Sequence, residues 1–181
     1  DGMLVYTADK NGEGDRYFCK DGKIQRESDD GSRDSRYPKE DDHELDVPLA
    51  VLVNGNSASA SEVFTGAVMD YDAGIVVGTT TFGKGIVQNL IPLGDGTAIK
   101  LTTAHYYTPN GFDLHGKGLE PDVVVEMDEE LQKKAVVELS EDNQLQAAIE
   151  VCTSIHKDQS DQVDVDAYLE KMESMSRNGS I

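Results

Sequence analysis

Ser59 and Lys84 carry side chains that together could cleave an acyl bond. Ser59 lies in a run of small residues at 54–62, and Lys84 lies between Gly83 and Gly85. A neutral lysine amine can remove the proton of a serine hydroxyl as the oxygen attacks a carbonyl, which is an established alternative to a histidine base. This chemistry requires that the chain bring the two side chains together.

The elements around these two residues predict that they meet. Residues 47–53 form an apolar run that predicts a buried strand, residues 59–71 carry apolar side chains at helical spacing, and residues 75–79 predict a second strand. At ~1.5 Å per residue the helix carries the chain ~18 Å from Ser59, and at ~3.3 Å per residue the strand returns it by ~17 Å. Ser59 and Lys84 are therefore expected at the same end of one sheet, where α/β folds usually place their sites.

Each of these residues also has a simpler interpretation. Ser59 and Glu62 fit a capping box, in which the serine is the N-cap of the helix and the glutamate reaches back. A lysine is usually solvated and protonated, so Lys84 can act as a base only if it is desolvated, and the apolar residues around it would suit such a slot. Gln88 follows four residues after Lys84, which predicts that both lie on one face of a strand, but a polar residue on a half-exposed strand is equally ordinary.

The sequence resembles the carboxyl-terminal processing proteases, also called tail-specific proteases. Four segments in the order of that family carry the resemblance: Ser-Ala-Ser-Ala-Ser-Glu at 57–62, Thr-Phe-Gly-Lys-Gly-Ile-Val-Gln at 81–88, Leu-Thr-Thr-Ala-His-Tyr-Tyr-Thr-Pro-Asn-Gly at 101–111 and Gly-Lys-Gly-Leu-Glu-Pro-Asp at 116–122. The resemblance implies that Ser59 is the nucleophile, Lys84 the general base and Gln88 the residue that orients the lysine. Some family members carry a supporting acid at the position of Asp70, but helix geometry puts Asp70 ~16 Å from Ser59, so we expect a helix-end group there.

The resemblance also implies an α/β fold of the Clp-protease and crotonase type, of which this chain would hold a part. The implied activity is that of a serine endopeptidase acting on proteins with exposed, largely apolar C-terminal tails, at a location outside the cytoplasm. Backbone N–H groups at the helix start, that of Ser59 included, would stabilise the oxyanion.

We expect this chain to be a fragment, because the family's peptide-binding PDZ domain and the first half of its protease core are not in the sequence. Such a fragment would need its missing half, or a second copy in a homo-oligomer, to complete the sheet. The alternative of another kind is an interaction or regulatory module that keeps the fold without turnover.

A nucleotide-binding loop is the competing chemistry. Residues 78–84 match Gly-x-x-x-x-Gly-Lys directly after a predicted strand. Gly85 stands where Ser or Thr would hold magnesium, and the next residues have a strand pattern, so no helix N-terminus would face the phosphates. We therefore expect no nucleotide and no other cofactor.

The composition of the chain argues against several classes of ligand and partner. Thirty-five acidic against sixteen basic residues give a net charge of −19, which argues against nucleic acid or an anionic membrane surface. The four histidines lack metal-ligand spacing, and neither His105 nor His115 has a motif that would place it in a catalytic triad. Cys19 and Cys152 are too few for a disulfide framework; they could pair, but we favour ordinary buried thiols.

The rest of the chain predicts hairpins followed by helices. Strands are expected at 3–7, 16–19, 86–93, 97–107 and 122–126, with a tight turn at 94–96, and residues 20–45 are expected to form a long, mobile, polar loop. Helices are expected at 129–139, 143–156 and 165–175, with Asp142 as N-cap of the second. These patterns divide the chain into a partial protease core, 1–126, and a helical C-terminal extension, 127–181.

Overall fold

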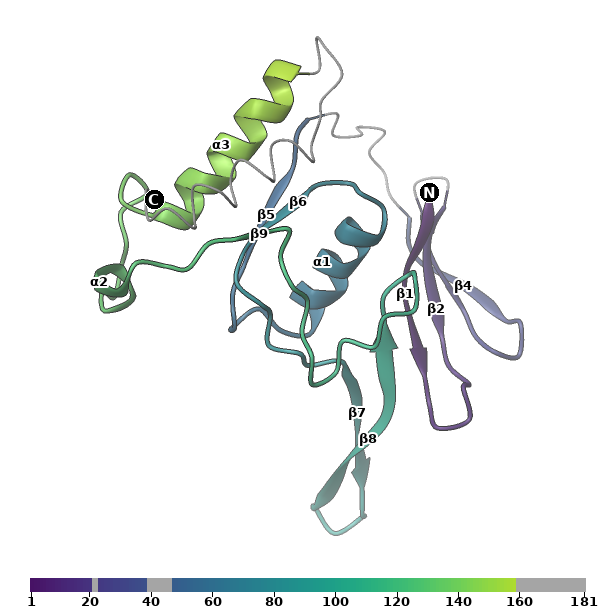
Figure 1. Cartoon of the computed structure of the whole chain (residues 1–181). Helices are drawn as coiled ribbons and strands as arrows, with labels where there is room; N and C mark the ends of the chain where they lie inside the picture. The colour runs from purple at the N-terminus through teal and green to yellow at the C-terminus, as the bar shows by residue number, and fades with distance from the viewer. Residues whose placement is uncertain (21–22, 39–46, 159–181) are drawn as a thin grey trace.

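The computed structural model describes residues 1–20, 23–38 and 47–158 of the 181. The elements follow in the order β1 (Gly2–Ala8), β2 (Arg16–Lys20), β3 (Lys23–Glu27), β4 (Arg33–Pro38), β5 (Ala50–Val53), α1 (Ala60–Asp70), β6 (Ile75–Gly78), β7 (Ile86–Pro92), β8 (Ala98–Tyr107), β9 (Val123–Val124), α2 (Glu129–Gln132) and α3 (Asn143–Asp158). The strands form a six-stranded antiparallel sheet and a three-stranded parallel sheet. Helix α1 contacts strands of both and lies between them (Figure 1). This architecture confirms the expected α/β class.

The three-stranded sheet, in the order β5-β6-β9, carries the hydrophobic core. Strands of a parallel sheet are covered on both faces and are therefore continuous apolar runs. Strand β6 is such a run, and its Val76 and Val77 are fully buried. Helices α1 and α3 lie on opposite sides of this sheet (Figure 1). On the α3 side the core consists of Val77, Val123, Val125, Ala147, Ala148 and Val151.

The β5–α1–β6 unit forms as the sequence predicts, with ends that differ by at most three residues. The register between the two parallel strands runs from Ala50 opposite Ile75 to Val53 opposite Gly78. Gly78 has a φ of 131°, and a Cβ there would overlap the carbonyl oxygen of Val53. The close approach at the carboxyl ends of β5 and β6 therefore requires glycine, and it fixes the point from which the chain leaves each strand.

The six-stranded sheet has the order β4-β3-β2-β1-β8-β7. Its β7–β8 hairpin closes through Gly94 and Gly96, both with φ near 90°, and Leu93 N donates to Thr97 O at 3.0 Å. The expected hairpin turn is thus confirmed. Strand β1 pairs antiparallel with β8, with Tyr6 opposite Tyr107, so the N-terminal hairpin and the 98–107 strand belong to one sheet.

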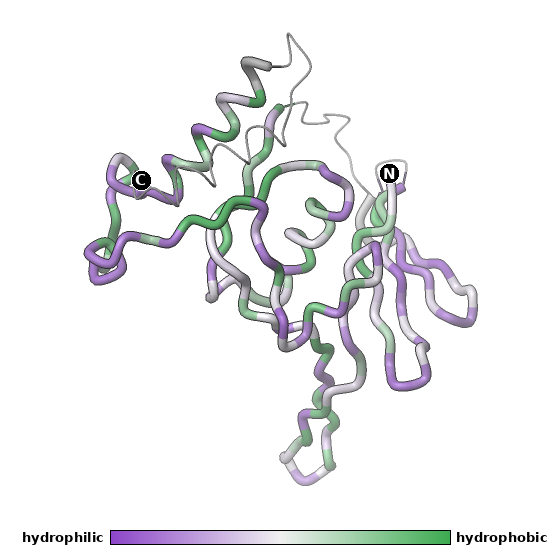
Figure 2. Tube along the Cα trace, in the orientation of Figure 1, coloured by the Kyte–Doolittle hydropathy of each residue, from purple (hydrophilic) through white to green (hydrophobic). Residues whose placement is uncertain are grey.

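The expectation of a long polar loop at 20–45 is wrong for residues 23–38, which form β3 and β4. These strands lack the apolar alternation that marks a half-buried strand, and Figure 2 shows this part of the chain as largely hydrophilic. Neighbouring ion pairs stabilise them instead: Arg33–Glu27 and Arg26–Asp15, both at 2.7 Å. The rest of the expected loop, 21–22 and 39–45, lies outside the described residues, except Lys20, which ends β2.

The helices after β9 differ from the expectation in length. Helix α3 confirms the predicted helix at 143–156, and Asp142 is its N-cap because Oδ1 accepts from Leu145 N at 2.9 Å. Helix α2 ends at Gln132, so the predicted helix at 129–139 is mostly turn, and the helix expected at 165–175 lies outside the described residues. None of the described helices has the length and apolarity needed to cross a bilayer.

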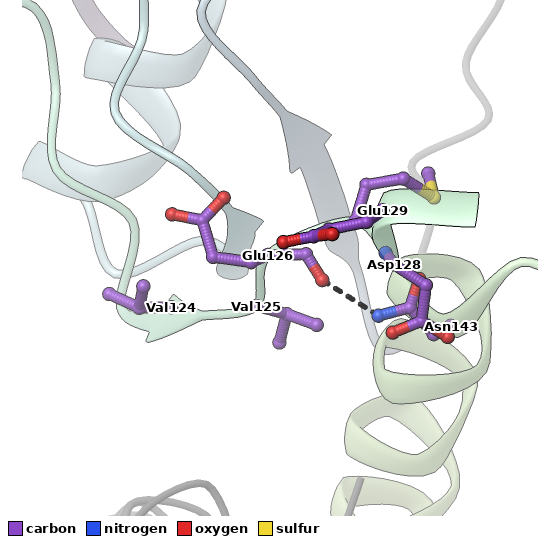
Figure 3. A pocket seen from close by; sticks show the side chains of 7 residues that line it. Val124, Val125, Glu126, Asp128, Glu129 and Asn143 are labelled. Atoms are coloured by element: carbon purple, nitrogen blue, oxygen red, sulfur yellow. Dashed lines mark hydrogen bonds between the residues drawn. The ribbon is translucent and has the colours of Figure 1, made fainter. Parts of the chain in front are cut away.

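The start of α3 is attached to the segment that leaves β9. Asn143 Nδ2 donates to Glu126 O at 2.7 Å, the bond drawn in Figure 3. An open pocket of about 320 Å³ lies beside this contact and is lined in part by Glu126, Asp128 and Glu129. Within the described residues no group of three His, Cys, Asp or Glu side chains has the geometry to hold a metal ion, so these acids are a solvated acidic face.

Both cysteines are free and half-buried. Cys19 lies on β2, and Cys152 lies on α3, where its Sγ is 3.8 Å from Pro48 O. The prediction that the two thiols are unpaired is therefore confirmed, whereas the prediction that they are buried is wrong, since both residues are only half-buried.

Candidate active site

Ser59 occupies a strained position between β5 and α1. Its φ of 58° and ψ of −113° are the angles that a type II′ turn requires at its first central residue, where glycine is the usual occupant. A residue with a Cβ pays of order 1–3 kcal/mol for such a conformation and keeps it only where the surroundings impose it. Nucleophilic serines of α/β hydrolases sit on a strained strand-to-helix turn of this kind.

Glu62 imposes this geometry from the first turn of α1. Its side chain is fully buried, and Oε2 accepts from Ser59 N at 2.9 Å, the glutamate half of the predicted capping box. The same oxygen accepts from Lys84 N at 2.8 Å. The main chains of Ser59 and Lys84 therefore meet at one carboxylate oxygen, as the strand and helix lengths predict.

The other oxygen of Glu62 holds the segment that leads to Lys84. Oε1 accepts from Thr81 Oγ1 and from Gly83 N, both at 2.6 Å. A carboxylate offers about four lone-pair sites, and here each is matched by a donor. The local sequence predicts only a cap for Glu62, because nothing in that pattern shows which distant donors a glutamate will meet.

Two Gly-Lys-Gly segments, 83–85 and 116–118, pack main chain against main chain. Gly116 N donates to Gly83 O at 2.9 Å, and a Cβ on Gly83 would lie 2.8 Å from Gly118 N. Gly118 has a φ of 75°, and a Cβ there would overlap the carbonyl oxygen of Thr81. Only glycine fits these contacts, so two of the four family-like segments lie together for a steric reason.

The structure departs from expectation around the side chains of Lys84 and Gln88. Phe82 and Lys84 are exposed, while Gly83 and Gly85, the two neighbours of Lys84, are buried. In this chain the expected desolvated slot around Lys84 is therefore not formed, because the glycines pack inward and the larger side chains point outward. Strand β7 begins only at Ile86, so Lys84 and Gln88 do not share a strand face, and Gln88 Nε2 instead donates to Thr102 Oγ1 at 3.3 Å.

A pocket of about 430 Å³ lies beside Ser59, between the start of α1 and the face of the six-stranded sheet. It is lined by Val5, Thr7, Asp15, Tyr17, Ser59, Ala60, Val63, Val87, Asn89, Thr103, Ala104 and Tyr106. Because Val87 and Asn89 face this pocket, Gln88 between them faces the opposite side of β7. The pocket is mostly apolar, which suits an uncharged side chain held next to the serine.

The amide of Ser59 is not a free donor at the helix start, since it is bonded to Glu62. The expectation that it stabilises an oxyanion is therefore wrong for this arrangement. The next amide, that of Ala60, has no acceptor among the described residues, as is usual for the first residue of a helix. In α/β hydrolases the residue after the nucleophile supplies an oxyanion donor, and Ala60 holds that position here.

His105 and His115 take no part in this site. His105 lies between Ala104 and Tyr106, which line the pocket, so its ring faces the other side of β8. There its Nδ1 is 3.2 Å from Asp113 Oδ2. Burial opposes ionisation of Asp113, but the hydrogen bonds from the His115 amide and the His105 ring outweigh it and keep the pKa of Asp113 below its ordinary value. These two contacts of Asp113 hold the segment 105–115 together.

Asp70 is at the far end of α1, where Oδ2 accepts from Asn110 N at 2.6 Å. It thus joins the helix end to the turn that follows β8, and the interpretation as a helix-end group fits this position. The catalytic roles of Ser59, Lys84 and Gln88 stay predictions.

Comparison with known proteins identifies a family and several similar proteins. The model of Peptidase family S41 matches residues 1–125. The chain is 54% identical over 79 residues to a carboxy-terminal-processing protease of Bartonella bacilliformis, covering 44% of this chain and 18% of that protein. It is 52% identical over 80 residues to a probable CtpA-like serine protease of Staphylococcus epidermidis, covering 44% and 16%.

Among solved structures, the photosystem II D1 C-terminal processing protease matches with a TM-score of 0.51 and 36% identity, over 69% of this chain and 28% of that one. This chain therefore spans less than a third of each of these three proteins. The family match extends over well more than half of its residues, from β1 to the end of the parallel sheet. The chain belongs to peptidase family S41.

Proposed function

We propose that this chain is the part of a serine endopeptidase that carries its Ser59–Lys84 pair. The observation that supports this most directly is the meeting of the Ser59 and Lys84 amides at one oxygen of a fully buried glutamate. The strained backbone of Ser59 at a strand-to-helix turn supports the same role, because strain of this kind gathers at catalytic positions.

The proposed reaction is acyl transfer through the serine. Neutral Lys84 Nζ takes the hydroxyl proton as Ser59 Oγ bonds to the peptide carbonyl carbon, and the Ala60 amide donates to the oxyanion. The ammonium of Lys84 then gives its proton to the leaving amine as the C–N bond breaks. Water attacks the acyl carbon as Lys84 Nζ takes a proton from it, the bond between that carbon and Ser59 Oγ breaks, and the Lys84 ammonium returns the proton to Oγ as the carboxylic acid product leaves. Gln88 is proposed to orient Lys84, which requires that it move from its present partner Thr102.

The proposed substrates are proteins with exposed, largely apolar C-terminal tails. The mostly apolar pocket at Ser59 fits an uncharged side chain next to the scissile bond. Two of the similar proteins are named as proteases that process carboxyl termini, which supports the same substrate class. A PDZ domain in the parent protein, a location outside the cytoplasm and assembly with a second copy belong to this proposal as the family resemblance implies them.

The exposure of Lys84 supports a second candidate. A solvated lysine keeps its proton at neutral pH and cannot act as a base. In this candidate the chain keeps the fold, binds other chains and has no turnover until further residues cover Lys84.

Mass spectrometry of an unstructured peptide with an apolar C-terminus tests the two candidates. The chain would be incubated with the peptide at mildly alkaline pH, beside Ser59→Ala, Lys84→Ala and the matched control Lys100→Ala, an exposed lysine on β8. We expect cleavage by the unmodified chain and by the control only. Equal cleavage by Lys84→Ala would exclude Lys84 as the base, and no cleavage by any chain would favour the module without turnover.

A further inference from the structure

We propose that Glu62 is a positioning residue that sets the distance between the proposed nucleophile and the proposed base, with Thr81 as its second anchor. This inference rests on the proposed roles of Ser59 and Lys84. It concerns a buried charged group that neither touches the reacting atoms nor enters the proton transfers.

A capping role does not account for the contacts of Glu62. A capping box uses one bond from the glutamate to the N-cap amide, here that of Ser59, and leaves the glutamate at the helix surface. Glu62 is instead fully buried and accepts three further bonds from Thr81, Gly83 and Lys84. Most of its bonding therefore serves the later segment and not the helix start.

The ionised carboxylate is the form that fits this site. All four contacts come from N–H or O–H donors, and a protonated acid would point a hydrogen at one of them. Burying a charge is costly unless it is well bonded. Here the four donors and the positive end of the α1 dipole, in whose first turn Glu62 lies, offset that cost.

Thr81 extends the connection to the second Gly-Lys-Gly segment. Its hydroxyl donates to Glu62 and accepts from Leu119 N at 2.8 Å, while Thr81 N donates to Leu119 O at 3.0 Å. Thr81 and Leu119 are both nearly fully buried. One carboxylate thus joins the Ser59 turn, the Lys84 segment and the residues that pack against Gly83.

The consequence is a geometric coupling between two residues that are far apart in sequence. One oxygen, Oε2, accepts from the amides of both Ser59 and Lys84, so loss of its charge weakens both bonds together and loss of this acceptor frees both amides at once. An amide side chain at position 62 would place an NH₂ group against two donors and could accept only with its remaining oxygen. Glu62→Gln keeps the size of the side chain and therefore isolates the bonding from the packing.

Amide hydrogen exchange of the whole chain, read residue by residue by NMR, tests the coupling without requiring turnover. In Glu62→Gln we expect exchange of the Ser59, Gly83 and Lys84 amides to accelerate by about tenfold or more, the loss expected for buried charge-assisted bonds. The core amides of Val76 and Val77 should stay at the unmodified rate. Glu150→Gln, an exposed glutamate on α3, is the matched control and should change none of them.

Thr81 provides a second pair of variants in case Glu62→Gln does not fold. Thr81→Ser keeps the hydroxyl and should keep the slow exchange of Gly83 and Lys84, while the isosteric Thr81→Val should accelerate it. Unchanged exchange at these amides in both Glu62→Gln and Thr81→Val would overturn the inference. Equal acceleration at Val76 and Val77 would also overturn it, since it would show a general loss of stability.

A covalent probe separates this inference from the proposed function. Phosphonylation of Ser59 by a fluorophosphonate, in which Oγ bonds to phosphorus and fluoride leaves, should be slower in Glu62→Gln by about tenfold or more in the rate of bond formation, with reagent binding unchanged. The increase of this reaction rate with pH should remain in Glu62→Gln, because the proposed base Lys84 is unchanged. If Ser59 of the unmodified chain does not react with the fluorophosphonate, the proposed function fails. The hydrogen-exchange experiment still decides the role of Glu62 in that case.

Discussion

Glycine at position 59 is expected to give a more stable protein than alanine at the same position, by about 1 kcal/mol. Both substitutions remove the serine hydroxyl, so their difference reports on the backbone alone. Ser59 has a φ of 58° and a ψ of −113°, which glycine adopts without steric cost and a residue with a Cβ does not. Ser59→Gly relieves strain of order 1–3 kcal/mol in the folded chain. The greater conformational freedom of glycine in the unfolded chain lowers the unfolding free energy by about 0.5–1 kcal/mol and so offsets part of this gain.

Urea denaturation of Ser59→Gly and Ser59→Ala measures this difference as a change in midpoint at constant slope. The control pair is Ser61→Gly and Ser61→Ala, at an exposed position in the first turn of α1 with ordinary helical angles. There the order should reverse, with glycine less stable by roughly 0.5–1 kcal/mol. If glycine were the less stable variant at both positions, the Ser59 backbone would be unstrained and the structural argument for its catalytic role would fail.

Two glycines, one acid and the two cysteines give further predictions. Gly118→Ala should destabilise the fold by more than Gly116→Ala, because both have positive φ but only at Gly118 would a Cβ overlap a backbone oxygen; urea midpoints of the two variants compare them. Asp113 has a lowered pKa, so the stability its charge contributes is present above the pKa of an unfolded aspartate and is lost as pH falls through the lower folded value. The gap in unfolding free energy between the unmodified chain and Asp113→Asn should therefore stay constant above pH about 5 and shrink as pH falls below the ~3.9 of an unfolded aspartate, and an unchanged gap would contradict this. Denatured without reductant, the chain should take up a thiol reagent at both Cys19 and Cys152.

The sequence predicts the parallel part of the fold well because there the signals agree. An apolar run, a helical repeat of apolar residues and a second apolar run describe β5, α1 and β6, and their lengths alone place residues 59 and 84 at one end of the sheet. The hairpin of β7 and β8 follows from the two glycines that surround Asp95. These elements are specified locally, and burial then supports each of them.

The β3–β4 hairpin could not be predicted in the same way. Its strands are polar on both faces, and the ion pairs of Arg26 with Asp15 and of Arg33 with Glu27 join residues whose proximity depends on the register itself. No periodicity marks such a strand. The extent of α2 was overestimated for a related reason, since residues 133–139 have helical composition but only Leu131 of this helix is buried.

In the candidate site, too, the features set by neighbouring residues could be predicted, and those set by contacts between distant segments could not. Spacing was enough to bring Ser59 and Lys84 together, but the capping pattern of Glu62 gave no sign that its carboxylate also accepts from Thr81, Gly83 and Lys84. The two Gly-Lys-Gly segments were recognised as family-like without a reason for their glycines. That reason is the main-chain contact between them, which exists only once both segments are folded.

The local rules fail at Ser59, and this failure agrees with the proposed role. A serine stands at position 59 where the backbone favours glycine, so the chain accepts strain that a single substitution would remove. The strain persists because Glu62 fixes the Ser59 amide while α1 begins at the next residue. If stability alone had shaped this turn, glycine would serve better and a buried carboxylate with four donors would be unnecessary. A hydroxyl kept at a cost and a charge buried to hold its backbone in place are therefore what the proposed nucleophile at Ser59 would require.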